Sequence, residues 1–280
     1  MNNLTLEQIL PESNLIAKNY ATASDNRIHS DEVAALYGFT GGLVPGVGNY
    51  AYLTHPVAAV LGREWLAHGA MTAKLLKPVY DGESVTVRGT VTDTDPVSIS
   101  LELFNQAGTL CAIAQASVPA ARPALEAADY PARAMPDPAQ RPQATMANLP
   151  VGMILGSREV RLDLAEIEAG FLNDMCDPLP IYRGPEAVCH PAFLLAEANQ
   201  ILVDNVALGP WIHTASVVQH YSLLQGGETL SLRGRVAEAF ERRGHEFVVL
   251  DLGMFADGAR PVAQIRHTAI IRLRERSEKV

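Results

Sequence analysis

The sequence predicts an α+β protein built from two copies of one unit, and three observations lead to this prediction. A short pattern occurs twice, a long apolar stretch precedes a series of strand patterns in each half, and a proline-rich segment separates the halves. With 280 residues, the chain is long enough for two domains of ordinary size.

The repeated pattern lies in a strand-like part of each half. GESVTVRGTV at residues 82–91 recurs as GETLSLRGRV at residues 227–236, an offset of 145 residues. The only two tryptophans, Trp65 and Trp211, follow nearly the same offset, with one residue of slippage. A repeat of this length indicates a duplicated domain rather than a solenoid.

Each half contains an apolar stretch without strand alternation, at residues 46–61 and 191–206, which predicts a buried helix. Strand patterns follow at residues 71–79, 84–92, 97–104 and 110–118, and at residues 214–224, 229–239, 246–255 and 261–273. The connections include turn sequences at residues 105–108 and 256–259, which are typical of hairpins. A helix followed by antiparallel strands, twice over, predicts a tandem or double hotdog. In this arrangement two antiparallel sheets, able to join edge to edge, each wrap around a long central helix.

The boundary between the copies is predicted from proline content. Residues 119–149 contain six prolines, which exclude a continuous helix or a central strand and indicate an extended connector. The predicted organisation is therefore a first unit at residues 1–118, this connector, and a second unit at residues 150–280.

Composition excludes several classes of protein. The net charge of −9 and the lack of a basic run argue against nucleic acid or an anionic membrane as a partner. No signal peptide or membrane-length apolar run is found, so a cytoplasmic location is expected. Three cysteines without CxxC spacing suggest neither a disulfide framework nor a metal site, and no cofactor is expected because no dinucleotide or phosphate loop appears.

A motif precedes the first apolar stretch. SDNRIH at residues 24–29 is followed by a short helical pattern ending in Gly38-Phe39, and Pro45-Gly46 opens the stretch. This resembles the signature of MaoC-like, (R)-specific enoyl-CoA hydratases and dehydratases: D-x-N-P-x-H, a short helix ending in G-F, and an H-G pair before the central helix. The matching residues, in order and spacing, are Asn26, Ile28, His29, Ala34, Gly38, Phe39 and Gly46.

The resemblance implies an acid–base site with an oxyanion donor. In the family an Asp and a His hold water against the double bond of an acyl thioester, while a backbone N–H at the helix start polarises its carbonyl. Here His29 would be the acid–base group and the N–H of Gly46 the donor. The family's Asp falls on Ser24, with Asp25 one residue late, so Asp25 and Asn26 are expected to position His29.

The second copy departs in the opposite way. DPLPIY at residues 177–182 keeps the Asp of the motif as Asp177 and replaces its His with Tyr182. His190 precedes the second apolar stretch, but Pro191 has no N–H to offer an oxyanion. Asp177, Tyr182 and His190 could converge as a polar cluster with His190 as an alternative base, whereas a composite site of Asp177 and His29 is disfavoured.

The leading hypothesis is a hydro-lyase that adds water to, or removes it from, a 2-enoyl thioester in acyl-CoA or fatty acid metabolism. The alternatives are a hotdog thioesterase, a specialised elimination or isomerisation enzyme, and a non-catalytic acyl-binding or partner subunit. The thioester carrier would be CoA or an acyl carrier protein, and a homodimer is compatible with the repeat. Structural roles are expected for the six other histidines, although His213 and His220, near Trp211 and Tyr221, could form a pocket wall.

Overall fold

The computed structural model describes residues 4–274, so residues 1–3 and 275–280, at the ends of the two predicted units, lie outside the described residues. The first half contributes β1 (Ser13–Ile16), β2 (Ala70–Leu75), β3 (Ser84–Thr94), β4 (Val97–Asn105) and β5 (Leu110–Ser117). The second half contributes β6 (Arg158–Arg161), β7 (Ile212–His220), β8 (Thr229–Arg242), β9 (His245–Ala256) and β10 (Arg260–Arg272).

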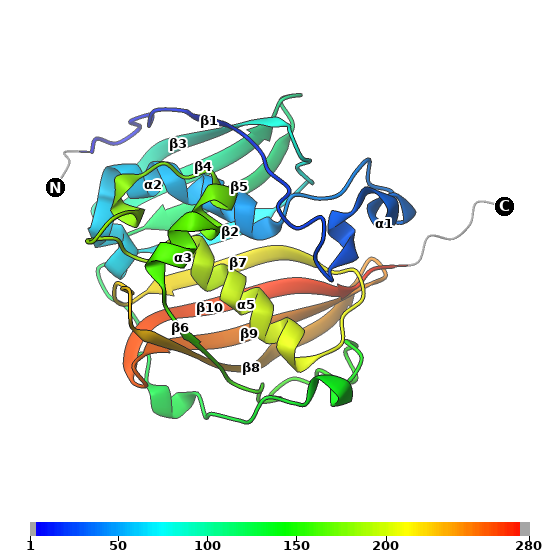
Figure 1. The fold of residues 1–280 in the computed structure, drawn as a ribbon. Coiled ribbons are helices and arrows are strands. Elements are labelled where there is room, and N and C mark those ends of the chain that lie inside the picture. The colour runs from blue at the N-terminus through cyan, green and yellow to red at the C-terminus, as the bar shows by residue number, and fades with distance from the viewer. Residues whose placement is uncertain (1–3, 275–280) are drawn as a thin grey trace.

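All these strands form one antiparallel sheet of ten strands, in the order β1-β3-β4-β5-β2-β7-β10-β9-β8-β6 (Figure 1). Strands β2 and β7 join the halves, and Thr72 lies opposite Val217 at the centre of their pairing. These two residues are 145 positions apart, which is the offset of the sequence repeat. The predicted sheets of the two halves join edge to edge into one continuous sheet, in which β2 and β7 satisfy each other's backbone groups.

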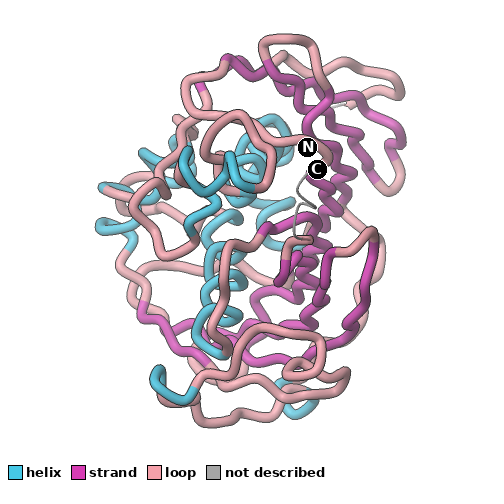
Figure 2. The backbone as a smooth tube through the Cα atoms, turned by 90° about the vertical axis from the view of Figure 1, so that its right-hand side faces the viewer, coloured by secondary structure: helices cyan, strands magenta, loops and turns pink. Residues whose placement is uncertain are grey.

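Two long helices lie on the same face of this sheet (Figure 2). Helix α2 (Gly46–His68) and helix α5 (Pro191–Asn205) begin where the apolar stretches begin. Helix α2 continues past the predicted end at residue 61, and Gly62, with φ of 55°, interrupts its helical backbone. Both helices are apolar on most of their circumference, because they contact each other as well as the sheet.

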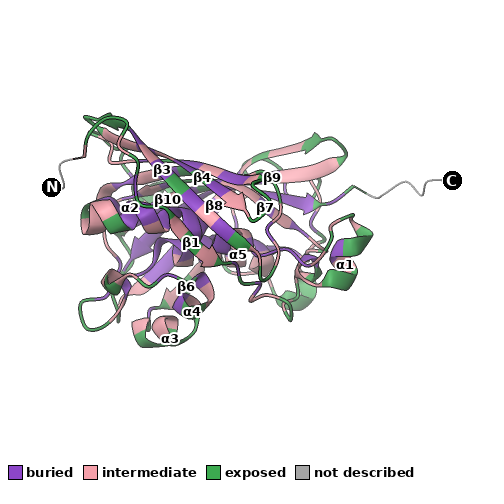
Figure 3. Cartoon of the chain, turned by 90° about the horizontal axis from the view of Figure 1, so that it is seen from above, coloured by how far each residue is buried: buried purple, intermediate pink, exposed green. Residues whose placement is uncertain are grey.

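The burial of the strands differs between the halves (Figure 3). In β3, Val85, Val87 and Val91 are fully buried and alternate with more exposed residues, as predicted for a sheet with one wet face. In β9, every residue from Val248 to Ala256 is buried, including the outward-facing positions. The outer face of the second half is therefore covered over β9.

The connector supplies part of that cover. Tyr130 packs on Phe255 with ring centroids 5.9 Å apart, and its hydroxyl donates to Asp251 at 3.1 Å. Gln264 donates a hydrogen bond of 2.8 Å to the same hydroxyl. The connector, residues 119–149, contains two short 3-10 turns, η2 (Ala127–Asp129) and η3 (Pro138–Gln140), and no α-helix or strand.

Short helices surround the starts of the long ones. They are η1 (Arg27–His29), α1 (Asp31–Leu36), α3 (Leu164–Ala169), α4 (Phe171–Met175) and η4 (Pro180–Tyr182). None of the described helices is both long enough and apolar enough to cross a membrane.

Candidate active site

His29 is held on a loop that folds back against the start of α2. Its Nδ1 lies 2.7 Å from the carbonyl oxygen of Leu43, so Nδ1 carries the hydrogen and Nε2 keeps a lone pair in the neutral ring. Asn19 donates to the His29 carbonyl at 2.8 Å, and a Cβ on Gly42 would lie 2.1 Å from that carbonyl oxygen. Burial lowers the pKa of His29, so the imidazole is neutral near pH 7.

Asn26 ties this loop to the second half of the chain. Its side-chain amide donates to the carbonyl of Trp211 at 3.0 Å and accepts from the Trp211 N–H at 3.2 Å. The same amide nitrogen lies 3.3 Å from His29 Nε2. Asn26 is therefore within hydrogen-bond distance of His29, and its role in positioning His29 stays a prediction.

Helix α2 begins without a side-chain cap. Its N-cap residue is Pro45, while Gly48 and Asn49 both donate their backbone N–H to the Pro45 carbonyl. The first N–H groups of an α-helix, here those of Gly46 and Val47, have no partner within the helix. With the helix dipole, such a start favours an oxygen that carries negative charge.

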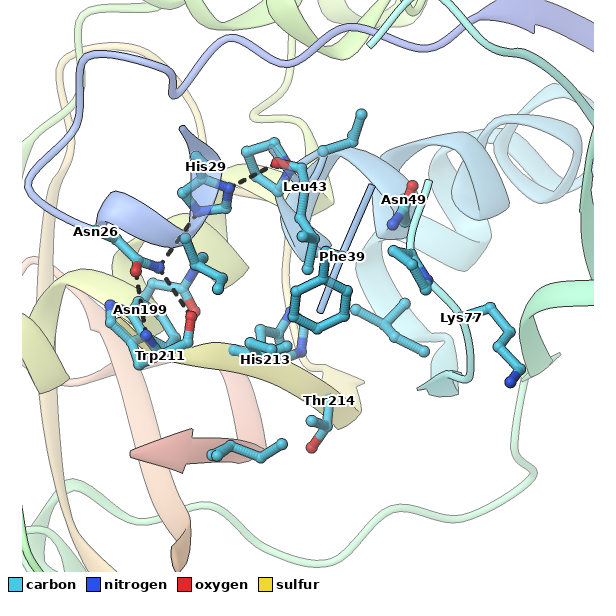
Figure 4. Close-up of a pocket in the computed structure, with 18 of the residues that line it drawn as sticks. Asn26, His29, Phe39, Leu43, Asn49, Lys77, Asn199, Trp211, His213 and Thr214 are labelled. Carbon is cyan, nitrogen blue, oxygen red and sulfur yellow. Dashed lines mark hydrogen bonds between the residues drawn. The ribbon is translucent and has the colours of Figure 1, made fainter. Parts of the chain in front are cut away.

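A cavity of about 240 Å³ lies between His29 and the start of α2 (Figure 4). Its wall comes from both halves, with His29, Phe39 and Gly46 from the first and Trp211 and His213 from the second. A larger, more open groove of about 690 Å³ also borders on His29 and Trp211. The His29 side chain thus stands between a small, mostly apolar cavity and a wetter groove.

Unpartnered polar atoms gather on the wall of the small cavity. Asn49 Oδ1, Asn199 Oδ1 and His213 Nδ1 are buried and have no hydrogen-bond partner among the described residues, and all three residues line this cavity. Buried polar groups are normally hydrogen-bonded, so such a gathering indicates a place where a polar ligand or water binds.

The second copy brings its predicted residues together in a different form. Asp177 lies 3.2 Å from His190 Nε2 and 3.0 Å from Nδ1 of His55, which belongs to α2. The Tyr182 ring lies 4.4 Å from that of His190. Hydrogen bonds to the two histidines lower the pKa of Asp177 despite its burial, and burial lowers that of His190.

This cluster is packed rather than open. His190 is fully buried, and its Nδ1 accepts the backbone N–H of Ala192, which caps α5. Beside Pro191, at the position equivalent to Gly46, the cavity is only about 10 Å³. The arrangement can stabilise the second helix start, but it leaves no room for a substrate.

Ser24 and Asp25 border on the same wide groove as His29, but neither makes a hydrogen bond to it. Ser24 donates to the carbonyl of Asn26 at 3.3 Å, and Asp25 is exposed on the wide groove, with no hydrogen bond or ion pair among the described residues. The expectation that Asp25 would position His29 is not met. Asp177 is bound by His190 and His55, away from His29.

The sequence suggested His213 as part of a pocket wall, but it did not indicate that residues of the second half line the same cavity as His29. Trp211 and His213 reach it across the β2–β7 pairing, which no local pattern reveals. Asn49 could have been found, because it is a polar residue near the start of a mostly apolar stretch, three residues after Gly46.

No family model and no curated protein matches the chain. A MaoC domain protein described as a dehydratase, from Chloroflexus aurantiacus J-10-fl, matches with a TM-score of 0.64 and 12% identity, over 97% of both chains. A conserved Mycobacterium tuberculosis protein, described as having a double hotdog fold, matches with a TM-score of 0.64 and 16% identity, over 96% of this chain and 97% of that one. An oleoyl thioesterase from Lactobacillus plantarum matches with a TM-score of 0.53 and 10% identity, over 95% and 98%.

These likenesses show that the chain has the double hotdog fold, as the repeat predicted. The solved structures that share this fold include proteins named as MaoC-like dehydratases. Residues 24–46 of this chain resemble the signature of that family. The solved structures also include proteins named as thioesterases, so proteins named for different activities share the fold.

Proposed function

We propose that the protein is a hydratase or dehydratase that acts on an acyl thioester, reversibly adding water to a 2-enoyl group. The observation that carries the proposal is the convergence of His29 and the uncapped start of α2 at Gly46 on one cavity. The motif resemblance and the fold of the MaoC-like dehydratases support the same chemistry.

In the proposed reaction, His29 Nε2 removes a proton from a water molecule as its oxygen attacks the β-carbon. Negative charge then develops on the thioester oxygen, where the Gly46 N–H and the helix dipole stabilise it. The imidazolium of His29 returns the proton to the α-carbon, so one residue acts as base and then as acid. This single-residue cycle accounts for the absence of a carboxylate at the position of Ser24.

The small cavity and the larger groove would hold different parts of the substrate. The small cavity suits a short acyl group, because it is smaller than the pockets that hold drug-sized ligands. The larger groove, which Arg141 and Gln200 help to line, would take the polar arm of a CoA or acyl carrier protein thioester.

The direct test is an assay of the purified protein with crotonyl-CoA. Hydration of the double bond should remove the conjugated enoyl absorbance without release of free thiol. An unchanged absorbance at high enzyme concentration would contradict it.

Thioester hydrolysis is the second candidate, because a thioesterase shares the fold over nearly the whole chain and the family's carboxylate is replaced by Ser24. Free thiol released from butyryl-CoA, which has no double bond to hydrate, would favour this activity. Binding of crotonyl-CoA without either reaction would instead indicate an acyl-binding subunit.

A further inference from the structure

His213 is a residue of the second half that reaches into the cavity of the first. It lies on β7, yet a Cβ placed on Gly46 would come within 2.6 Å of its Nδ1. The imidazole therefore stands directly beside the start of α2, on the wall of the cavity that also contains His29.

The two ring nitrogens of His213 have different surroundings. Nε2 lies 2.8 Å from the hydroxyl oxygen of Ser216, whereas Nδ1 is buried and has no partner among the described residues. Ser216 Oγ in turn lies 3.4 Å from Nδ1 of His267. Burial lowers the pKa of His213 to about 4, although a hydrogen bond with the Ala215 backbone opposes part of this shift. Burial also lowers the pKa of His267. Both rings are therefore neutral near pH 7.

The hydroxyl of Ser216 decides which nitrogen of His213 carries the hydrogen. If His267 Nδ1 donates to Ser216 and Ser216 donates to His213 Nε2, then His213 presents an N–H to the cavity. Each order leaves one buried ring N–H without a partner among the described residues, that of His213 Nδ1 in the first order and that of His267 Nε2 in the reverse. Of the two residues, His213 lines the cavity, where a bound oxygen can accept the hydrogen bond, so a ligand in the cavity favours the first order.

The same chain of groups is missing at the equivalent place in the other half. Ser216 pairs with His267 across β7 and β10, whereas the equivalent pair across β2 and β5 is Met71 and Ala116. The polar chain of β7 and β10 therefore occurs beside the cavity of about 240 Å³, whereas the equivalent positions on β2 and β5 are apolar.

We propose that His213 is a catalytic residue of the first-half site, whose neutral Nδ1–H joins the Gly46 N–H in binding the substrate's carbonyl oxygen. The nature of that oxygen, a thioester carbonyl, rests on the proposed function. Ser216 is then a positioning residue, because it sets the tautomer of His213 without touching the substrate.

The kinetic test compares two substitutions of the same residue with crotonyl-CoA as substrate. His213→Leu removes the donor and should lower kcat by about 10²-fold, the usual effect of losing one oxyanion donor. His213→Asn keeps an amide N–H near the position of Nδ1 and should retain kcat within about tenfold of the wild type. Equal kcat losses in the two variants, or no loss in His213→Leu, would overturn the proposal.

A second measurement does not depend on the reaction or on the folding of these variants. In ¹⁵N spectra of the free wild-type protein at pH 7, His213 should be neutral with its hydrogen on Nδ1, and Ser216→Ala should shift it toward a mixture of tautomers. A wild-type ring protonated on Nε2 alone would overturn the role of His213. If crotonyl-CoA is not turned over but Nδ1 carries the hydrogen, the proposed function fails while the donor in the cavity remains.

Discussion

The two long helices begin in opposite ways. Helix α2 starts at Gly46 after an uncapped Pro45, so its first N–H groups face a cavity. Helix α5 starts at Pro191, which has no N–H, and the side chain of His190 caps Ala192. One helix start is therefore uncapped beside a cavity, while the other is part of the packed core.

Equivalent positions in the two halves explain the difference in cavity volume. At the offset of 145 residues, Asn49 corresponds to Leu194 and Gly46 to Pro191. The larger, apolar residues lie in the second half, where the cavity is about 10 Å³, against about 240 Å³ in the first. Close packing accounts for the contrast, since a few side chains of different size can fill a space that a ligand would need.

The largest difference between the halves is expected when the histidine before each long helix is removed. His29→Ala should lower kcat/KM with crotonyl-CoA by about 10²–10⁴-fold, the range for loss of an acid–base group. His190→Ala should leave the activity nearly unchanged and lower the free energy of unfolding by about 3 kcal/mol, because Asp177 loses a buried partner. Kinetic assays and urea denaturation of both variants provide the measurement. Equal activity of the His29 variant and the wild type would refute the functional division of the halves.

Substitutions at the first residue of each long helix test the difference between the two helix starts. Gly46→Ala places a Cβ 2.6 Å from both His213 Nδ1 and Leu75 Cδ1, so the oxyanion position should be lost and kcat/KM should fall by about 10²-fold. Pro191→Ala restores an N–H in the second half but creates no cavity, so turnover should stay at the wild-type rate. A new activity in the double variant Pro191→Ala with His29→Ala would show that the second site can work after all.

Stability should depend on pH mainly through the second half. Burial lowers the pKa of His213 and His220 to about 4, whereas the unfolded value is about 6.5. Below pH 6.5 the unfolded chain binds protons that the folded chain does not, so stability falls as the pH drops toward 4 and is unaffected by these groups above 6.5. Each histidine contributes a slope of about 1.4 kcal/mol per pH unit in this range.

The matched variant for this prediction is His220→Leu, because the equivalent residue in the first half is Leu75. Urea denaturation between pH 7.5 and 5, conditions chosen to span the unfolded value of about 6.5, should give a shallower pH dependence for this variant. An unchanged slope would mean that His220 titrates normally in the folded protein.

The smallest effect is expected at the connector, which covers the outer face of the second half. Tyr130→Phe keeps the contact with Phe255 and loses the hydrogen bonds to Asp251 and Gln264. The free energy of unfolding should fall by about 1 kcal/mol, and activity should not change. Thermal unfolding measures the loss, and a fall in activity would show that the cover communicates with the site.

Periodicity in the sequence was sufficient to predict most of the fold. The eight main strands and both long helix starts were predicted, because their apolar faces have a clear period and are bounded by turns, although the patterns at residues 71–79 and 214–224 extend four residues beyond the ends of β2 and β7. Strands β1 and β6 were missed, since each has four residues at the edge of the sheet and little pattern. The predicted apolar stretch ends at residue 61, whereas α2 continues to His68 past the interruption of its helical backbone at Gly62.

The candidate site was predicted only in its local part. The motif placed His29, Asn26 and Gly46, which the loop before α2 brings to one cavity. His213 reaches it through long-range pairing of β7 with β2, which a pattern along the chain cannot indicate. Asp25 was expected beside His29 but is exposed, since adjacent residues on a loop point in different directions.

The central claim is that only the first half binds substrate, and the stoichiometry of binding tests it most directly. Isothermal titration of the wild-type protein with butyryl-CoA, a saturated analogue of the enoyl substrate, should give one site per chain. Gly46→Leu, which fills the first cavity, should abolish binding, whereas His190→Ala should leave one site. Two sites per chain, or binding that survives Gly46→Leu, would contradict the account.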